Sequence, residues 1–340
     1  MSLRSPAFRL VKGGKDLLLA SYTRSTRTGG QRITGLADPV AIYREFEAGA
    51  TIVLQGLHRH WLPLARFCRD LEIALGHPTQ VNAYITPPGS QGLAVHRDEH
   101  DVFVLQVHGA KRWQVYEPGP ELPPPGPPLI EEELGRGDCL YIPRGFPHAA
   151  STQERASAHL TIGILSYTWA DLLRDVTKKA DAEPEFSRPL PIRFQNDSEG
   201  MRRATGDHLR SFAVWLEKQD AAEAVERITR RFFTGRRPIL TGQLRQLEAL
   251  ESLGDASRVR RRPGAMCVIR PGGQEISVLI GDRELRMPGW VRPAVEELAE
   301  GPDVAIGDLR PHLDAESRMV LVRRLVREGL LEVVGTARET

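Results

Sequence analysis

The chain has 340 residues, of which 41% are hydrophobic and 26% charged, values typical of a globular protein that can bury a sizeable core. Lys and Arg total 46 and Asp and Glu 44, so the formal charge of +2 does not by itself indicate a nucleic-acid or membrane partner. The three cysteines, Cys68, Cys139 and Cys267, form no C-x-x-C pair, which argues against a disulfide framework and a thiolate zinc site. Without a signal-peptide pattern or a run of ~20 apolar residues, we expect a soluble cytoplasmic protein with no membrane partner.

Residues 1–170 are rich in short β-like runs that end at glycine, proline or polar turn residues, for example 81–85, 102–107, 139–142 and 160–165. Such spacing predicts an all-β barrel or sandwich. Residues 61–75 break the pattern, because Leu64, Phe67, Cys68, Leu71 and Leu75 recur at helical spacing and predict one amphipathic helix. The proline-rich segment 117–128 predicts a loop between strands, since proline lacks a donor for a ladder.

The rest of the chain divides into two predicted domains. Residues 171–238 carry apolar side chains at spacings of three and four, which predicts a small helical domain. Residues 239–340 alternate β-like runs at 267–269 and 276–280 with helical stretches at 293–300 and 315–328, a succession that resembles part of a winged helix. We therefore expect three domains, at 1–170, 171–238 and 239–340.

A metal-ligand pattern begins at His96-Arg97-Asp98. Residues i and i+2 of a strand share one face, so His96 and Asp98 would present an imidazole and a carboxylate side by side. About fifty residues later, His148 ends the glycine- and proline-rich segment 137–148, which predicts a tight turn that fixes one side chain. Two imidazoles and one carboxylate form the facial triad that leaves positions open on non-haem iron(II).

A second possible metal site is a zinc pair made by His96 and His100 on a helix. The glycine- and proline-rich segment 86–92 before it and the β-branched run 102–107 after it favour strands, and no glutamate follows His96. His100 and His108 flank the predicted site, and the sequence assigns neither of them a role.

Segments 96–118 and 137–148 are similar to the Jumonji-C oxygenases of the cupin superfamily, in particular to the ribosomal oxygenases. The cupin motif Gly-x5-Pro-x-Gly-x2-His is matched up to His148, with Thr152 where the motif ends in asparagine. Asp98 stands where the first cupin motif has its second histidine, a departure that the oxygenase branch shares. The resemblance implies a mainly β double-stranded β-helix of the cupin or jelly-roll type, followed by a helical dimerisation region and a winged-helix-like unit.

The resemblance also implies a co-substrate site. Fe(II), 2-oxoglutarate and O2 would be bound, with the metal on His96, Asp98 and His148. Lys111 would pair with the far carboxylate of 2-oxoglutarate, and a dianion bound inside a barrel needs a cationic partner on physical grounds as well. The remaining pocket residues implied are Asn82, Tyr84 and Thr161. Gly163 stands where relatives often have a polar residue, so one expected co-substrate hydrogen bond is in doubt.

The activity implied is hydroxylation of a protein or peptide side chain by a homodimer, with an arginine or histidine of a ribosomal protein as the expected target. Two alternatives stay open. The same chemistry could serve a biosynthetic peptide or a small molecule. Alternatively, the chain is a non-redox metal-binding cupin or a nucleic-acid-binding regulator, for which the helix at 315–328 offers four arginines interrupted by Glu316 and Glu328.

Overall fold

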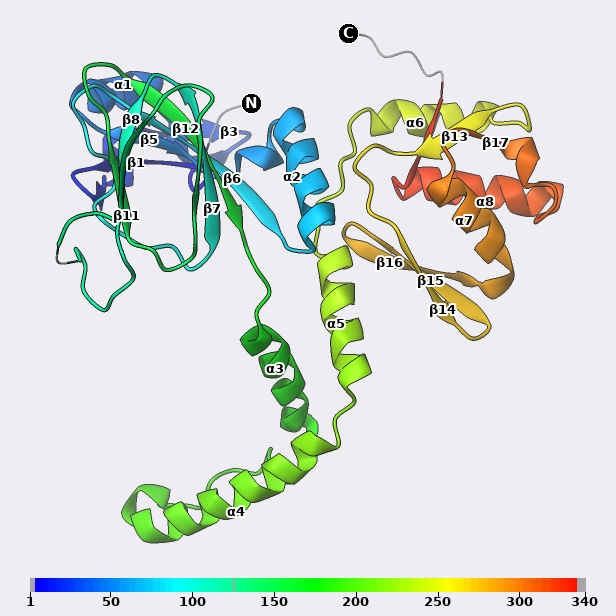
Figure 1. Ribbon diagram of the computed structural model, residues 1–340. Helices are drawn as coiled ribbons and strands as arrows, with labels where there is room; N and C mark the ends of the chain where they lie inside the picture. The colour runs from blue at the N-terminus through cyan, green and yellow to red at the C-terminus, as the bar shows by residue number, and fades with distance from the viewer. Residues whose placement is uncertain (1–3, 125, 335–340) are drawn as a thin grey trace. The chain divides into compact units, whose positions relative to one another are not determined.

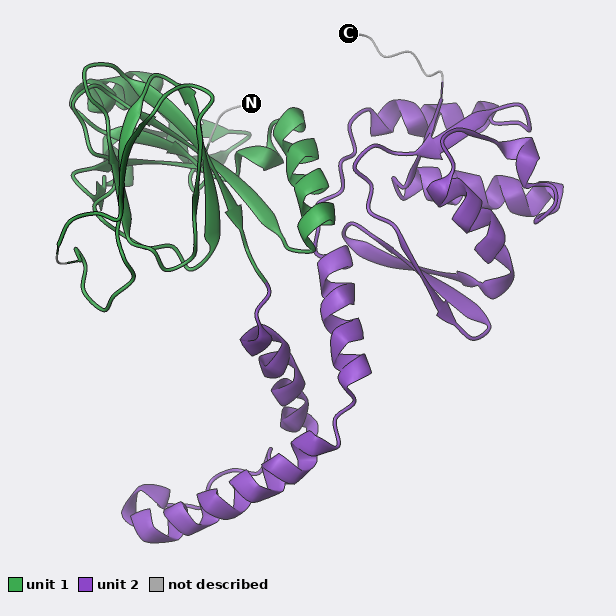
Figure 2. Cartoon of the chain, in the orientation of Figure 1, with its two compact units in different colours: residues 1–166 green, residues 167–340 purple. Residues whose placement is uncertain are grey.

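The computed structural model describes residues 4–124 and 126–334, and it divides the chain into two units, residues 1–166 and residues 167–340 (Figure 2). The three-domain division expected from the sequence stays a prediction. Among the described residues, no helix is long and apolar enough to cross a membrane.

The first unit contains two main antiparallel sheets, as the β-rich sequence predicts (Figure 1). The larger has the order β10-β7-β12-β6-β5-β1-β2, and the smaller has the order β11-β8-β9. Their strands are β1 (Phe8–Lys12), β2 (Lys15–Asp16), β5 (Thr51–Leu54), β6 (Thr79–Thr86), β7 (Asp101–His108), β8 (Lys111–Val115), β9 (Ile130–Leu134), β10 (Cys139–Ile142), β11 (His148–Ser151) and β12 (Ser157–Ile164). Side chains from both sheets line one cavity, so the sheets face each other.

Smaller elements surround these sheets. They are η1 (Leu19–Ser21), the hairpin of β3 (Thr23–Thr28) and β4 (Gln31–Ala37), α1 (Pro39–Glu47), η2 (Leu57–Arg59) and α2 (Leu62–Leu75). The helix predicted over 61–75 is confirmed as α2, which ends at Gly76 in the left-handed conformation (φ 69°). Its Leu64 and Cys68 pack against Val81 of β6 and Ile162 of β12. Because β6 and β12 bury these residues under α2, the alternating residues of both strands point into the space between the sheets.

Two predictions concern segments without regular structure. The described residues of 117–128 contain neither helix nor strand, as expected for the proline-rich loop. The strand expected at His96 and Asp98 is wrong in detail, since residues 91–98 form only two isolated bridges, Gln91 with Ser151 and His96 with His148. These bridges still place the segment alongside β11.

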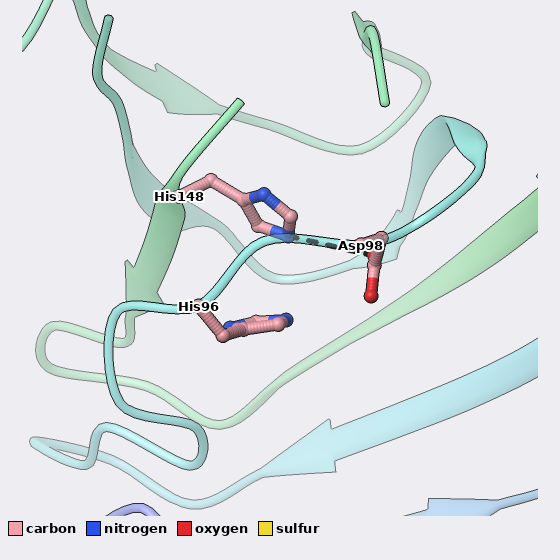
Figure 3. A group of neighbouring side chains, drawn as sticks. All are labelled: His96, Asp98 and His148. Carbon is pink, nitrogen blue, oxygen red and sulfur yellow. Dashed lines mark ion pairs between the residues drawn. The ribbon is translucent and has the colours of Figure 1, made fainter. Parts of the chain in front are cut away.

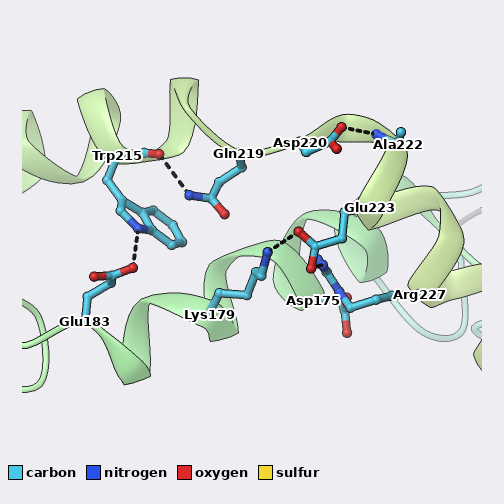
Figure 4. Close-up of polar contacts among 9 residues, drawn as sticks. All are labelled: Asp175, Lys179, Glu183, Trp215, Gln219, Asp220, Ala222, Glu223 and Arg227. Carbon is cyan, nitrogen blue, oxygen red and sulfur yellow. Dashed lines mark hydrogen bonds and ion pairs between the residues drawn. The ribbon is translucent and has the colours of Figure 1, made fainter.

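The second unit begins with helices α3 (Trp169–Thr177), η3 (Lys178–Ala182), η4 (Phe194–Asn196), α4 (Ser198–Glu217) and α5 (Ala221–Thr234), so the helical prediction is confirmed here. Figure 4 shows how polar contacts join them. Arg227 of α5 donates to Asp175 of α3 (2.7 Å), and Lys179 of η3 donates to Glu223 of α5 (2.6 Å).

The remainder of this unit has its own core. Its elements are α6 (Gln243–Ala249), η5 (Leu250–Ser252), β13 (Arg258–Arg261), β14 (Val268–Gly272), β15 (Glu275–Ile280), β16 (Arg283–Pro288), η6 (Gly289–Val291), α7 (Arg292–Glu300), β17 (Val304–Ala305), η7 (Ile306–Leu309), α8 (Ala315–Arg327) and β18 (Leu331–Val333). They form two three-stranded sheets, β17-β13-β18 and β14-β15-β16. Fully buried residues such as Val278, Ala294, Val322 and Leu325 join β15, α7 and α8 into one hydrophobic cluster.

Candidate metal centre

His96 and His148 are brought together by the backbone. The amide of His96 donates to the carbonyl of His148 (3.1 Å), and the amide of His148 donates to the carbonyl of His96 (2.8 Å). This reciprocal pair places the two imidazole rings with their centroids 4.4 Å apart. Residues far apart in the sequence therefore become direct neighbours through one antiparallel bridge.

Asp98 completes the group (Figure 3). Its Oδ2 lies 3.8 Å from Nε2 of His148, and the candidate ligand atoms of the three residues all lie within 4.8 Å of one another. The carbonyl of Asp98 accepts a hydrogen bond from the amide of Gly145 (2.9 Å), in the turn that precedes His148. Gly145 has φ 84°, so this turn requires a residue that tolerates the left-handed region. The glycine- and proline-rich turn predicted before His148 is thus confirmed.

Hydrogen bonds fix the orientation of both imidazoles. Nδ1 of His96 lies 2.9 Å from the carbonyl of Ala94, and Nδ1 of His148 lies 3.0 Å from the carbonyl of Phe146. A carbonyl only accepts, so each Nδ1 carries the proton and each Nε2 keeps a free lone pair. Burial, and next the charge of His96, lower the pKa of His148, which keeps this ring neutral. Two neutral nitrogens and one carboxylate fit a divalent iron and leave positions open on it.

Lys111 lies in the cavity that these three residues also line. Its side chain is buried, with 3% exposed, and its Nζ donates to Oγ1 of Thr86 (2.8 Å). No carboxylate pairs with it among residues 4–124 and 126–334. Burial lowers the pKa of Lys111 to about 7. A buried amine without an anion fits a cavity that receives a carboxylate, because the anion would supply the missing charge partner.

His159 forms the wall beside Lys111. Its Nδ1 lies 3.1 Å from Nζ of Lys111, and its ring stacks on Tyr84 (centroids 4.9 Å apart, planes 6° apart). Burial, followed by the charge of Lys111, lowers the pKa of His159 well below its ordinary value, so the ring is neutral and Nδ1 accepts from Nζ of Lys111. Trp113 packs edge-on against His159, and its buried Nε1 has no hydrogen-bond partner in the described part of the chain. This indole N–H is one more donor for an anionic ligand.

The structure brings six of the seven predicted site residues to one cavity, namely His96, Asp98, His148, Lys111, Tyr84 and Thr161. Asn82 does not line it. The Asn82 Oδ1 instead accepts from the amide of Gly56 (2.9 Å), although Asn82 is paired with Thr161 across β6 and β12. The co-substrate role expected for Asn82 therefore stays a prediction.

Among the other lining residues, sequence reasoning missed four whose side chains carry a polar group, Thr51, Thr86, Trp113 and His159. Three of them carried a signal. Thr86, Trp113 and His159 each lie two residues from a predicted pocket residue, and period two places such neighbours on the same face of a strand. Thr51 carried none, because only the pairing of β5 with β6 brings its Oγ1 within 3.0 Å of Oγ1 of Thr86.

Two facing antiparallel sheets, with a His-x-Asp…His group between them, define a double-stranded β-helix of the cupin type. Within that class, residues 57–172 match the family model described as the JmjC domain, so this part of the chain is a JmjC domain. The resemblance given by the sequence is confirmed.

Curated relatives agree with this assignment. "Bifunctional lysine-specific demethylase and histidyl-hydroxylase NO66" of Drosophila melanogaster is 30% identical over 243 residues, which cover 61% of this chain and 37% of the relative. "Ribosomal oxygenase 1" of Homo sapiens is 34% identical over 210 residues, which cover 55% of this chain and 32% of the relative. The chain thus spans about a third of the length of these curated relatives.

A solved structure matches over most of the chain. YcfD, a ribosomal oxygenase from Escherichia coli in complex with cobalt and 2-oxoglutarate, has a TM-score of 0.55 and 20% sequence identity, and the match covers 96% of this chain and 86% of that one. At this identity the likeness establishes the fold.

Proposed function

We propose that this chain is an Fe(II)- and 2-oxoglutarate-dependent oxygenase that hydroxylates a protein side chain. One observation carries the proposal. A single cavity is lined both by three candidate metal ligands, whose ligand atoms lie within 4.8 Å of one another, and by Lys111, a buried amine without an anion. The ligand set suits iron(II), and the amine suits the far carboxylate of the keto acid.

The residues have distinct roles in this proposal. His96, Asp98 and His148 would hold Fe(II), and the carbonyls of Ala94 and Phe146 keep both imidazoles in the tautomer that binds metal. When bound, the iron and 2-oxoglutarate supply the oxidative chemistry that activates O2 toward a C–H bond. The cavity between the sheets would shield the reacting centre in part from bulk water.

Lys111, the amine of the cavity, would bind the far carboxylate of 2-oxoglutarate. Thr86 and His159 hold its Nζ in place, at 2.8 Å and 3.1 Å. A cavity that served only a resident metal in a non-redox cupin has no need of this buried amine. Lys111 therefore argues for the oxygenase over that alternative.

The substrate we propose is a histidine or arginine side chain of a ribosomal protein. The names of the relatives, a histidyl-hydroxylase and ribosomal oxygenases, support this choice. The same site acting on a biosynthetic peptide or a small molecule is the alternative. Lysine demethylation, which the name of one relative includes, would be distinguished by its product, because it removes a methyl group where hydroxylation adds an oxygen.

The test supplies the purified chain with Fe(II), 2-oxoglutarate and O2, and measures succinate release together with the mass of ribosomal-protein peptides. We expect succinate release and the gain of one oxygen on a peptide. Asp98→Ala and His148→Ala should lose metal binding and both activities, while His108→Ala, at an exposed histidine of β7, should retain them. Absence of succinate from a metal-loaded chain would refute the oxygenase.

We also propose that the chain forms a homodimer through its helical region. None of the 20 residues of α4 is buried, and Leu209 and Val214 expose 63% and 52% of their area. A second copy would cover these side chains. Sedimentation of the full chain should give twice the monomer mass. Leu209→Glu should lower the measured mass toward that of the monomer. Arg202→Glu, at an exposed arginine of the same helix, is the control and should lower the mass less.

Two further expectations remain proposals. The order α7, β17, η7, α8, β18 supports a winged-helix-like unit, because β13 joins β17 and β18 into a small sheet beside a helix–short helix–helix succession. A cytoplasmic location is supported by the three cysteines, all of which are free.

A further inference from the structure

His100, two residues beyond Asp98, places its imidazole directly against Gly163 of β12. A Cβ atom at position 163 would lie 2.6 Å from both Cδ2 and Nε2 of this ring, and 3.3 Å from Cγ of Gln80. Non-bonded atoms do not approach to 2.6 Å, so the ring keeps this position only because residue 163 is glycine. The ring of His100 therefore occupies the space that a side chain at position 163 would fill.

His100 lies toward the end of the site that is remote from Lys111. His159, Thr161 and Gly163 alternate along β12 and point to the same side. His159 contacts Lys111, and Thr161 lines the cavity. Gly163 is four residues beyond His159, which is roughly 13 Å along a strand. A co-substrate anchored at Lys111 thus leaves the neighbourhood of Gly163 and His100 to another ligand.

The ring of His100 has unused hydrogen-bonding capacity. It is half-buried, and neither of its nitrogens has a hydrogen-bond partner among the residues that the structure describes. The side chain of Gln80, next to the same glycine, also has none. A role in packing alone does not need such groups, because an apolar side chain at position 163 would fill the space without leaving polar atoms unpaired. The ring offers one donor and one acceptor beside the metal-binding residues.

We propose that His100, seated on Gly163, is a substrate-binding residue that hydrogen-bonds the peptide next to the side chain being hydroxylated. This inference rests on the proposed oxygenase function and names the group that selects its substrate. In this view, the hydrogen bond to the peptide comes from the segment after Asp98, and position 163 of β12 carries no side chain, so the ring of His100 fits there.

The test uses ribosomal-protein peptides with a central arginine or histidine that the wild-type chain oxidises. His100→Ala should raise the KM for the peptide about tenfold, and should weaken peptide binding to the cobalt- and 2-oxoglutarate-loaded chain to the same degree, as the loss of one good hydrogen bond predicts. His100→Gln keeps a donor and an acceptor and should restore part of the affinity. The 2-oxoglutarate concentration for half-maximal succinate release should stay within about twofold.

Gly163→Ala tests the same contact from the other side. Its Cβ should displace the ring and reproduce the rise in peptide KM, and it should add little when His100 is already alanine, because both changes remove one interaction. His108→Ala, at an exposed histidine of β7, is the matched control. Circular dichroism and cobalt binding verify that each variant folds. If Gly163→Ala does not fold, the peptide KM values of His100→Ala and His100→Gln test the proposal on their own.

The inference is overturned if His100→Ala leaves peptide KM and binding unchanged, or if it raises the half-saturating 2-oxoglutarate concentration instead. A wild-type chain that releases succinate but neither binds nor oxidises any peptide would refute the protein substrate, and His100 as its ligand with it. A chain that releases no succinate would refute the oxygenase itself. These outcomes are separate measurements, so failure of the inference is distinguishable from failure of the proposed function.

Discussion

At the scale of single residues, the charge state of Lys111 controls how the pocket would bind the carboxylate of 2-oxoglutarate. Burial lowers the pKa of this amine from 10.5 to about 7, and no carboxylate of the described residues pairs with the ammonium form to offset this effect. In the unfolded chain the amine keeps its ordinary pKa, so between pH 7 and 10.5 the unfolded state binds more protons than the folded state. Stability contributed by this residue therefore rises with pH through that window. A bound carboxylate reverses the effect by stabilising the ammonium form.

We predict that 2-oxoglutarate binding at pH 8 takes up close to one proton, since the amine is mostly neutral before binding and charged afterwards. Calorimetry of the metal-loaded chain in buffers of different ionisation enthalpy measures this uptake. Lys111→Met should abolish the uptake and raise the KM for 2-oxoglutarate roughly ten- to a hundredfold, the loss expected for a charged hydrogen bond. Lys179→Met, in the helical region, is the control, and equal proton uptake by both variants would exclude Lys111 as the partner.

At the scale of elements, a buried ion pair within α2 holds the glutamate that links this helix to β6. Nε of Arg69 lies 3.1 Å from Oε2 of Glu72, both side chains are buried, and Oε1 of Glu72 accepts from the amide of Thr79 at the start of β6. Removing one partner of a buried pair leaves an uncompensated charge. The position of α2 over the outer face of the large sheet thus depends on polar as well as apolar contacts.

Arg69→Met should lower the free energy of unfolding by about 3–5 kcal/mol, measured in urea. Replacing both members, as Arg69→Met with Glu72→Leu, should recover part of this loss, because no unpaired charge then remains. Arg66→Met, at an exposed position of the same helix, should change stability by less than about 0.5 kcal/mol. Equal losses of unfolding free energy at positions 66 and 69 would show that the buried ion pair does not stabilise the protein.

The proline-rich loop after β8 is anchored to the metal-binding segment through Arg97. The guanidinium group of this arginine donates to the carbonyls of Gly119 (2.6 Å) and Pro120 (3.3 Å). Arg97→Met should increase cleavage after Glu121 by a glutamate-specific protease several-fold, since the loop opens more often without this clamp. Arg97→Lys should show a smaller increase, because an ammonium group lacks the two-pronged geometry. Unchanged cleavage in both variants would mean that the loop is held by other contacts.

At the scale of the whole molecule, the two units have separate hydrophobic clusters. Val81, Val102 and Val104 belong to clusters of the first unit, and the largest cluster, which includes Val278 and Leu325, lies in the second. Calorimetry should resolve two unfolding transitions, and cobalt with 2-oxoglutarate should raise the temperature of only one, because a ligand stabilises the unit that binds it. A single transition that shifts as a whole would show that the units unfold together.

The nucleic-acid alternative loses part of its basis at this scale. Of the arginines in the predicted recognition helix, Arg318 is buried and donates to both carboxylate oxygens of Asp255 (2.9 and 2.7 Å). This arginine supports the fold rather than facing a phosphate backbone. Arg324 and Arg327 stay exposed, so the basic face of α8 is smaller than the sequence suggests.

The sequence by itself determined the β-rich first unit, α2, the helical region and the three candidate metal ligands. These features depend on local periodicity, on the glycine–proline turn before His148 and on side-chain chemistry, all of which are contained in short stretches of chain. The family resemblance implied Lys111, and the need of a dianionic ligand for a cationic partner supported it.

Only the tertiary structure decided which neighbours each of these residues has. The bridge between His96 and His148, the wall formed by His159, the structural role of Asn82 and the ring of His100 on Gly163 all depend on strand register between segments distant in the sequence. Register follows from how whole faces pack, and a one-residue slip would turn every one of these side chains to the opposite face of its strand. For that reason the ligands were predictable from local patterns, whereas the contacts among the pocket residues were not.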